Sequence, residues 1–279
     1  MSGSVAAYAA SLSREFLMVR GSRVAVYVAP EDGRPVALLV HGFSGSYGGM
    51  TYLAEELRDV FRVVLIDMPS HGATDYMTFR DGDDIVAYMR AVAGAVSERY
   101  GTVSWLVGHS MGAGIVSMMQ PALPGARLAF ICPVPTPSRV YDASIRLMQR
   151  SVMMRWLQGV QLLAVPRGMA LLKCWRGGGF RRMCDNAVRY GAASWRQMNE
   201  RANMPSLVIA NRQFRGVAVD LVIAGRSDAT AKERTAAELE AAFPSATIHM
   251  LPGGHLLPIE SPAAVAAVFL RYNDDILNT

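Results

Sequence analysis

The 279-residue sequence has few cysteines and histidines and no long apolar run. Its three cysteines, Cys132, Cys174 and Cys184, are odd in number and form no Cys-x-x-Cys pair, so we predict free thiols and a cytoplasmic location instead of a disulfide framework. No stretch reaches the roughly 18 apolar residues that a membrane span needs. Residues 1–18 lack the basic start and compact apolar centre of a signal peptide, and we expect an amphipathic helix or a frayed leader there.

Motifs for metals, nucleotides and nucleic acids are missing as well. There is no His-Glu-x-x-His motif, and we predict neither a metal nor a cofactor. Three consecutive glycines at 177–179 follow no predicted strand and precede no Lys-Ser/Thr, which favours a loop over a phosphate-binding turn. No segment resembles a nucleic-acid-binding module.

Acidic residues are scarce in one segment. Residues 138–215 contain fourteen Lys and Arg but three acids, a net charge of +11. The rest has 28 − 14 = 14 basic and 23 − 3 = 20 acidic residues, a net charge of −6. The overall charge of +5 therefore hides one strongly basic segment. Its arginines either form a solvated surface or attract an anionic substrate, an acidic carrier protein or an anionic membrane surface, and the sequence leaves these alternatives open.

Apolar residues make up 51% of the chain, enough for a large buried core. Short apolar runs alternate with segments of helical periodicity, which predicts an α/β fold with a mostly parallel sheet of eight strands covered by helices on both faces. The expected strands are residues 16–20, 23–28, 36–40, 61–66, 103–109, 127–132, 217–224 and 247–251. The expected helices include residues 52–60, 81–100, 231–243 and 262–272.

The alternation stops at the proline-rich residues 133–137. For about eighty residues there is no clear buried strand, and Met, Leu, Trp and Arg recur at helical spacing. We predict a helical cap at residues 134–215, inserted after the sixth strand into a core formed by residues 1–133 and 216–279.

A Gly-x-Ser-x-Gly turn links the strand at 103–109 to a helix-forming stretch. This layout is typical of a nucleophile elbow, in which the serine adopts a strained backbone and both flanking glycines avoid collisions. It predicts Ser110 as the nucleophile, supported by Gly108, His109 and Gly112. The backbone N–H of Met111, at the start of the helix, would then face developing negative charge.

A second glycine-bearing loop follows the buried strand at 36–40. His41 and Gly42 open this loop, and we expect the backbone N–H of Phe43 to be the second donor of an oxyanion hole. Such a loop directly after a strand also occurs as an ordinary turn, so the assignment depends on the elbow.

The general base is predicted by elimination among five histidines. His109 belongs to the elbow and should point away from the serine hydroxyl, His41 and His71 lie in early loops, and His249 lies within a strand. His255 remains, on a Gly-Gly loop after the last strand, which leaves it free to reach the elbow.

The carboxylate is predicted in the same way. Asp228 follows the seventh strand at the sheet edge where such sites form. We place Asp220 in mid-strand, interpret Asp67 as a turn-stabilising residue, and expect Glu260 to start a helix.

These motifs, His41-Gly42, Gly108-His109-Ser110-Met111-Gly112, the Gly-x-x-Asp ending at Asp228 and the His255 loop, resemble the α/β-hydrolase superfamily in kind and order. The resemblance implies a capped serine hydrolase. It excludes the haloalkane dehalogenases and epoxide hydrolases of the superfamily, which use aspartate at the position of Ser110. One departure is Ser70, where relatives usually have glycine.

We expect a carboxylesterase acting on a small molecule. The same triad also serves thioester, carbon–carbon bond and lactone hydrolysis, and the sequence leaves these open. A different class of protein, a ligand receptor that kept the fold without activity, remains the non-enzymatic alternative.

Overall fold

The computed structural model describes residues 3–43, 45–150 and 217–278. They contain an eight-stranded sheet in the order β1-β2-β4-β3-β5-β6-β7-β8, in which β2 runs against its neighbours β1 and β4 and the remaining pairs are parallel. The strands are β1 (Ser13–Val19), β2 (Ser22–Val28), β3 (Val36–Val40), β4 (Arg62–Ile66), β5 (Val103–His109), β6 (Arg127–Ile131), β7 (Leu221–Gly225) and β8 (Thr247–Leu251). The predicted α/β-hydrolase fold is confirmed.

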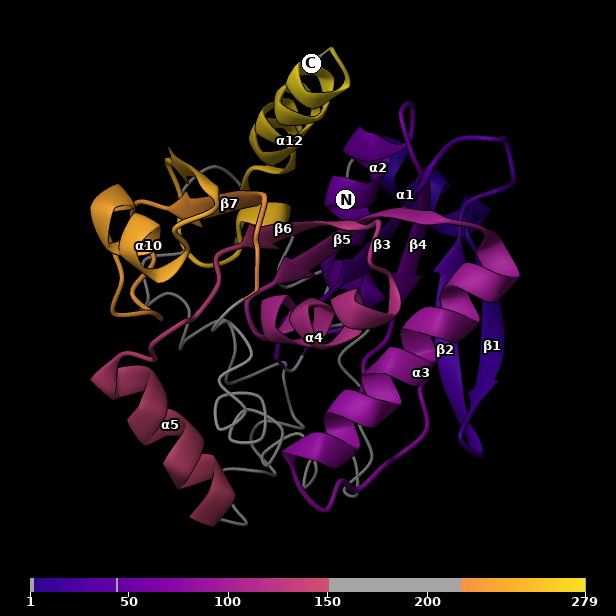
Figure 1. Cartoon of the computed structure of the whole chain (residues 1–279), viewed down its shortest axis with the longest axis horizontal. Helices are drawn as coiled ribbons and strands as arrows, with labels where there is room; N and C mark the ends of the chain where they lie inside the picture. Colours follow the sequence, from indigo (N-terminus) through magenta and orange to yellow (C-terminus); the bar gives the residue numbers. More distant parts are fainter. Residues whose placement is uncertain (1–2, 44, 151–216, 279) are drawn as a thin grey trace.

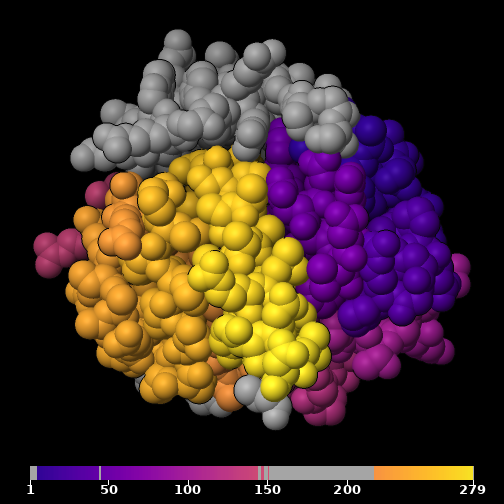
Figure 2. All heavy atoms as spheres, turned by 90° about the horizontal axis from the view of Figure 1, so that it is seen from above, coloured from indigo at the N-terminus to yellow at the C-terminus, as the bar shows by residue number. Residues whose placement is uncertain are grey.

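Helices cover both faces of this sheet (Figure 1). One face carries α3 (Gly82–Tyr100), α4 (Met111–Met119) and α10 (Ala236–Ala242). The other carries α1 (Gly3–Ser11), α2 (Thr51–Leu57) and α12 (Pro262–Leu277), with the short α11 (Leu257–Glu260) beside them. Seen from above, α12 lies directly against the N-terminal part of the chain, which includes α2 (Figure 2).

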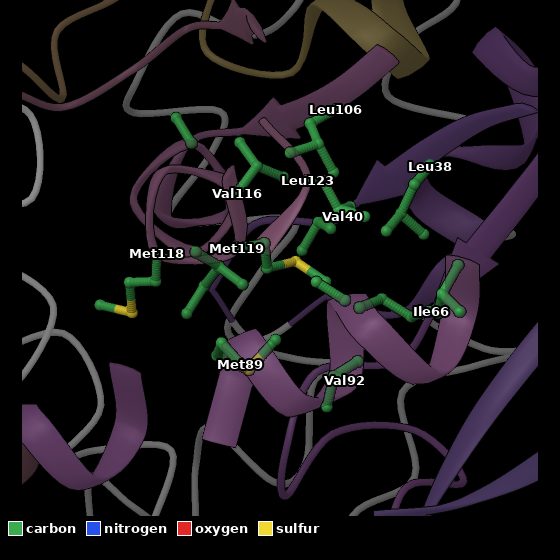
Figure 3. Close-up of a cluster of buried hydrophobic side chains, with 14 of the residues drawn as sticks. Leu38, Val40, Ile66, Met89, Val92, Leu106, Val116, Met118, Met119 and Leu123 are labelled. Carbon is green, nitrogen blue, oxygen red and sulfur yellow. The ribbon is translucent and has the colours of Figure 1, made fainter. Parts of the chain in front are cut away.

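The central strands are apolar throughout because both of their faces are buried. In β3, Leu38 and Val40 point into the cluster under α3 and α4, whereas Ala37 and Leu39 point into the cluster under α2 and α12. Figure 3 shows side chains of the first cluster converging from β3, β4 and β5 and from α3 and α4. This two-sided packing fixes the carboxyl ends of β3 and β5, where the predicted site lies.

Several predicted boundaries shift. The strand predicted from residue 217 begins at Leu221, and Asp220 precedes it, so placing Asp220 in mid-strand was wrong. Its carboxylate accepts hydrogen bonds from the Leu128 N–H and from Arg127. The helix predicted over 231–243 spans only α10, because Thr235 and Glu238 form a capping box that starts it there.

An insertion separates β6 from its neighbour β7. Its described part contains α5 (Arg139–Arg150) and joins the core through an isolated bridge between Pro137 and Ala231 and a bond from Ser138 N–H to Thr230 C=O. Residues 151–216, with most of the predicted cap, the glycines at 177–179, Cys174 and Cys184, lie outside the described residues. In the ranges that are described, no helix has the length and apolarity to cross a membrane.

Candidate active site

Ser110 lies at the turn between β5 and α4 with a strained backbone. Its φ of 55° and ψ of −119° fall where non-glycine residues rarely occur. The flanking glycines have no room for a side chain: a Cβ at Gly108 would lie 2.4 Å from the Gly112 carbonyl oxygen, and one at Gly112 would lie 2.5 Å from the carbonyl oxygens of Val40 and His41. The geometry is that of a nucleophile elbow.

A continuous hydrogen-bonded chain joins the three predicted catalytic side chains. Ser110 Oγ lies 2.7 Å from His255 Nε2, and His255 Nδ1 lies 2.7 Å from Asp228 Oδ2. Because an ionised carboxylate only accepts, the Nδ1–H donates to Asp228, which leaves Nε2 to accept the serine proton. This is the arrangement that lets an imidazole act as general base toward a hydroxyl.

Asp228 is held as a carboxylate. Burial, the largest single influence, raises the pKa of Asp228, but the charge and hydrogen bond of His255 together with bonds from Thr230 outweigh it, so the pKa lies below its usual range. The Thr230 N–H donates to Oδ1 at 2.8 Å, which leaves Oδ2 for the imidazole.

His109 does not compete with His255 as a base. Burial and the neighbouring charge of His255 lower the pKa of His109 to about 3, so the ring is neutral near pH 7. Its Nε2–H donates to the His255 carbonyl oxygen at 2.7 Å. As predicted, its ring hydrogen-bonds elsewhere than to the serine hydroxyl.

The loop after β3 is pinned close to the elbow. His41 Nε2 accepts from the Met68 N–H, so its Nδ1–H donates to the Gly42 carbonyl oxygen at 2.8 Å. That oxygen also accepts from the Gly45 N–H. Because the peptide is trans, the Phe43 N–H lies on the opposite edge of the same plane. Among the backbone–backbone hydrogen bonds between described residues, neither this N–H nor that of Met111 is a donor.

Asp67 and Ser70 shape the loop after β4. Asp67 is fully buried and accepts hydrogen bonds from the Tyr27 hydroxyl and the N–H groups of Tyr47 and Ala73, the contacts of a turn-stabilising residue. Ser70 has a φ of 62°, a conformation that favours glycine, while its hydroxyl bonds both the N–H and the C=O of Met77. The departure at Ser70 is therefore compensated by side-chain hydrogen bonds.

Cys132, a free and buried thiol, lies beside the triad at the end of β6. Among the described residues, the donor atoms of Cys132, Asp228 and His255 form a group close enough to hold a metal, all within 4.8 Å of one another. However, burial raises the pKa of the thiol well above its usual range, and His255 and Asp228 are already bonded to each other. We therefore interpret Asp228 and His255 as members of the hydrogen-bonded triad and not as metal ligands, because a metal at this site would need the Cys132 thiolate.

The position and contacts of Glu260 differ from those predicted from the sequence. It ends α11 instead of starting a helix, and its buried carboxylate accepts hydrogen bonds from the N–H groups of Gly254 and Leu256. The sequence signal was a glutamate five residues after His255 in a Pro-containing segment, which we interpreted as the start of a helix.

Comparison with known proteins agrees with this geometry. A model of the alpha/beta hydrolase family matches residues 37–268. The chain belongs to this family. Over 127 residues it is 29% identical to the dihydrolipoyllysine-residue acetyltransferase component of the acetoin cleaving system of Cupriavidus necator, a match that covers 45% of this chain and 33% of that protein.

Several proteins of known structure share the fold of this α/β hydrolase. An esterase from Thermogutta terrifontis superposes with a TM-score of 0.71 at 18% identity, over 95% of this chain and 99% of the other. An epoxide hydrolase from Vigna radiata gives a TM-score of 0.72 at 16% identity, with the same coverage of both chains. At such low identity the likeness concerns the fold, which hosts several chemistries.

Proposed function

We propose that this hydrolase cleaves a small-molecule carboxylic ester through an acyl-enzyme on Ser110. The observation that carries the proposal is the unbroken chain from Ser110 Oγ through His255 to Asp228, with both distances at 2.7 Å. The pinned Gly42–Phe43 peptide and the helix N-terminus at Met111 support an oxyanion hole beside it. A ligand receptor without activity would have no need of the strain at Ser110.

The reaction follows from the proton positions. Ser110 Oγ attacks the ester carbonyl while its proton passes to His255 Nε2, and Asp228 stabilises the imidazolium that forms. The tetrahedral oxyanion is held by the N–H groups of Phe43 and Met111. Its collapse breaks the bond to the alcohol, which leaves with the proton from His255. A water molecule, deprotonated by the same imidazole, then releases the acid and restores Ser110.

The first test combines a covalent label with activity. A fluorophosphonate should label the parent on Ser110, and Ser110→Ala should abolish labelling and lower kcat for a p-nitrophenyl ester by at least about 10⁴-fold. Circular dichroism checks that the variant is folded. A folded Ser110→Ala variant with more than a few per cent of the parent kcat, compared at equal protein concentration, would remove Ser110 from this role.

The substrate class follows from charge. We propose that the ester or its carrier is anionic, because residues 138–215 have a net charge of +11 and follow β6 in the sequence, and β6 is the neighbour of β5, the strand that leads to the elbow. In the described part of this segment, α5 contributes Arg139, Arg146 and Arg150, and Arg146 is paired with Asp142. An acidic carrier protein and an anionic membrane surface present the same charge. A panel of esters and thioesters that vary in acyl length and charge separates these substrates.

A further inference from the structure

One buried carboxylate holds the peptide backbone on both sides of His255. Glu260 Oε2 accepts from the Gly254 N–H at 2.8 Å, and Oε1 accepts from the Leu256 N–H at 3.2 Å. The Glu260 residue is 6% exposed, so these bonds are shielded from water. Each carboxylate oxygen thus binds one of the two residues that flank the base.

A third contact fixes the carbonyl between them. The His109 Nε2–H donates to the His255 carbonyl oxygen at 2.7 Å, and His109 directly precedes Ser110. The neutral ring keeps its second nitrogen unprotonated, because burial and the charge of His255 lower the pKa of His109 to about 3. The elbow and the His255 loop are therefore joined by a hydrogen bond that does not involve the Ser110 hydroxyl.

The loop needs such contacts because its own sequence leaves it free to move. Gly253 and Gly254 precede His255, and glycine loses more conformational freedom on folding than any other residue. Gly253 has a φ of 142°, and a Cβ there would lie 2.6 Å from Leu257 Cδ2 and 3.2 Å from Glu260 Oε2. The backbone thus passes close to the Glu260 carboxylate, and the φ of 142° at Gly253 is a conformation that favours glycine.

We propose that Glu260 and His109 are positioning residues for His255: together they hold its backbone so that Nε2 stays aimed at Ser110, while Asp228 holds the ring. The proposal rests on the proposed triad mechanism. It differs from the role of Asp228 because neither residue hydrogen-bonds to the imidazole nitrogens. Glu260 acts through two peptide N–H groups, and His109 acts through the His255 carbonyl oxygen and through its own ring, whose centroid lies 5.3 Å from that of the His255 ring.

Glu260→Gln tests the first half. A glutamine side chain has one accepting oxygen, so the N–H of Gly254 or Leu256 loses its acceptor and faces an NH₂ group. A displacement of about 1 Å in a reacting group can cost about 100-fold in rate. We expect kcat for a p-nitrophenyl ester to fall about 10- to 100-fold with KM changed less than about threefold, and the fluorophosphonate labelling rate to fall in parallel.

Glu238→Gln is the matched control. Glu238 also accepts from two backbone N–H groups, those of Arg234 and Thr235, but at the exposed start of α10. Both substitutions remove a carboxylate that bonds the backbone. The control should keep the parent kcat.

A double substitution separates positioning from general distortion. If Glu260 acts through His255, then Glu260→Gln added to His255→Ala should leave the residual activity unchanged, because no ring remains to be placed. If Glu260 only maintains the fold of the site, the oxyanion hole suffers too, and the double variant should fall below His255→Ala.

Two substitutions of His109 provide an independent test, which can be carried out even if Glu260→Gln does not fold. His109→Phe keeps a ring but removes the donor to the His255 carbonyl, and kcat should fall about 10-fold or more. His109→Gln restores an N–H donor and should recover a large part of that loss. Equal activity of the two variants would refute the role of His109.

The outcomes also separate this proposal from the triad itself. If Ser110 does not react with the fluorophosphonate in the parent, the proposed function fails. If Ser110 reacts and folded Glu260→Gln is labelled at the parent rate, the triad stands and the positioning role of Glu260 is overturned.

Discussion

Replacing His109 by glutamine should make the protein less sensitive to acid. The ring is buried between the elbow and the His255 loop, where burial lowers its pKa from 6.5 to about 3. Below about pH 6.5 the unfolded chain binds a proton at this residue that the folded chain cannot bind. Above about pH 6.5 this proton therefore does not lower the free energy of unfolding. As the pH falls from 6.5 toward 3, proton binding by the unfolded chain lowers that free energy progressively.

The size of the effect follows from these two values. Between pH 8 and pH 5, a group with a pKa of 6.5 unfolded and about 3 folded lowers the free energy of unfolding by about 2 kcal/mol. No solvent screening reduces this figure, because the ring lies inside the protein. In His109→Gln this part of the acid sensitivity should disappear, although the variant starts from a lower stability at pH 8.

Urea unfolding followed by circular dichroism at pH 8 and pH 5 measures the difference. Ile115→Val is the matched control: it removes one buried methylene from α4, costs about 1 kcal/mol, and should do so equally at both pH values. The reasoning is refuted if His109→Gln loses as much stability between pH 8 and pH 5 as the parent and the control.

Further predictions concern the triad, the elbow and the basic segment. Asp228→Asn should lower kcat about 10²- to 10⁴-fold, less than Ser110→Ala, because the carboxylate orients and stabilises the imidazolium without reacting; active-site titration and steady-state kinetics check this. Asp228 should stay ionised from pH 8 down to pH 5, because the charge and hydrogen bond of His255 and the bonds from Thr230 outweigh the effect of burial and hold its pKa below its usual range; a carboxyl ¹³C chemical shift of Asp228 that titrates in this range contradicts this. Gly112→Ala should cost about 3 kcal/mol or more in urea unfolding, because its Cβ meets two carbonyl oxygens at 2.5 Å, whereas Gly94→Ala, in open space on α3, should stabilise by about 0.5–1 kcal/mol. For an anionic ester, kcat/KM should fall several-fold between low salt and about 0.5 M salt, where the Debye length is about 4 Å; a neutral ester of equal length should not respond, and Arg181→Gln with Arg182→Gln should reduce the difference.

The core of the fold could be predicted because its signals are local. Continuous apolar runs identify strands buried on both faces, and Gly108-His109-Ser110-Met111-Gly112 specifies a tight turn whose collisions only glycine avoids. Asp228 follows β7 and His255 follows β8, and these two strands are neighbours in the sheet. Because both strands run parallel to β5, the loops after them lie at the same edge of the sheet as Ser110, which brings the three residues together.

Boundaries were less accurate because competing local interactions set them. The apolar residues from 217 and from 231 have the expected periodicity, but the Thr235–Glu238 capping box starts the helix later. The residues before it, including Asp228, form the loop that carries the carboxylate.

The role of Glu260 was beyond sequence reasoning for a different reason. Its partners are backbone N–H groups, which every residue but proline offers, so no residue type marks them. His109 has the same property: its acceptor is the carbonyl of His255, 146 residues away along the chain. Contacts between a side chain and a distant backbone leave no pattern in the sequence.

The insertion between β6 and β7 also bears on how the protein folds. Ser110 and His255 are 145 residues apart. The sheet brings them together only after β7 has paired with β6, from which the insertion separates it in the sequence. Such long-range closure is slow compared with forming the local elbow. During synthesis Ser110 emerges well before His255, and until the sheet closes it is an ordinary alcohol with no base beside it. Hydrolytic reactivity should thus be acquired in a late step of folding.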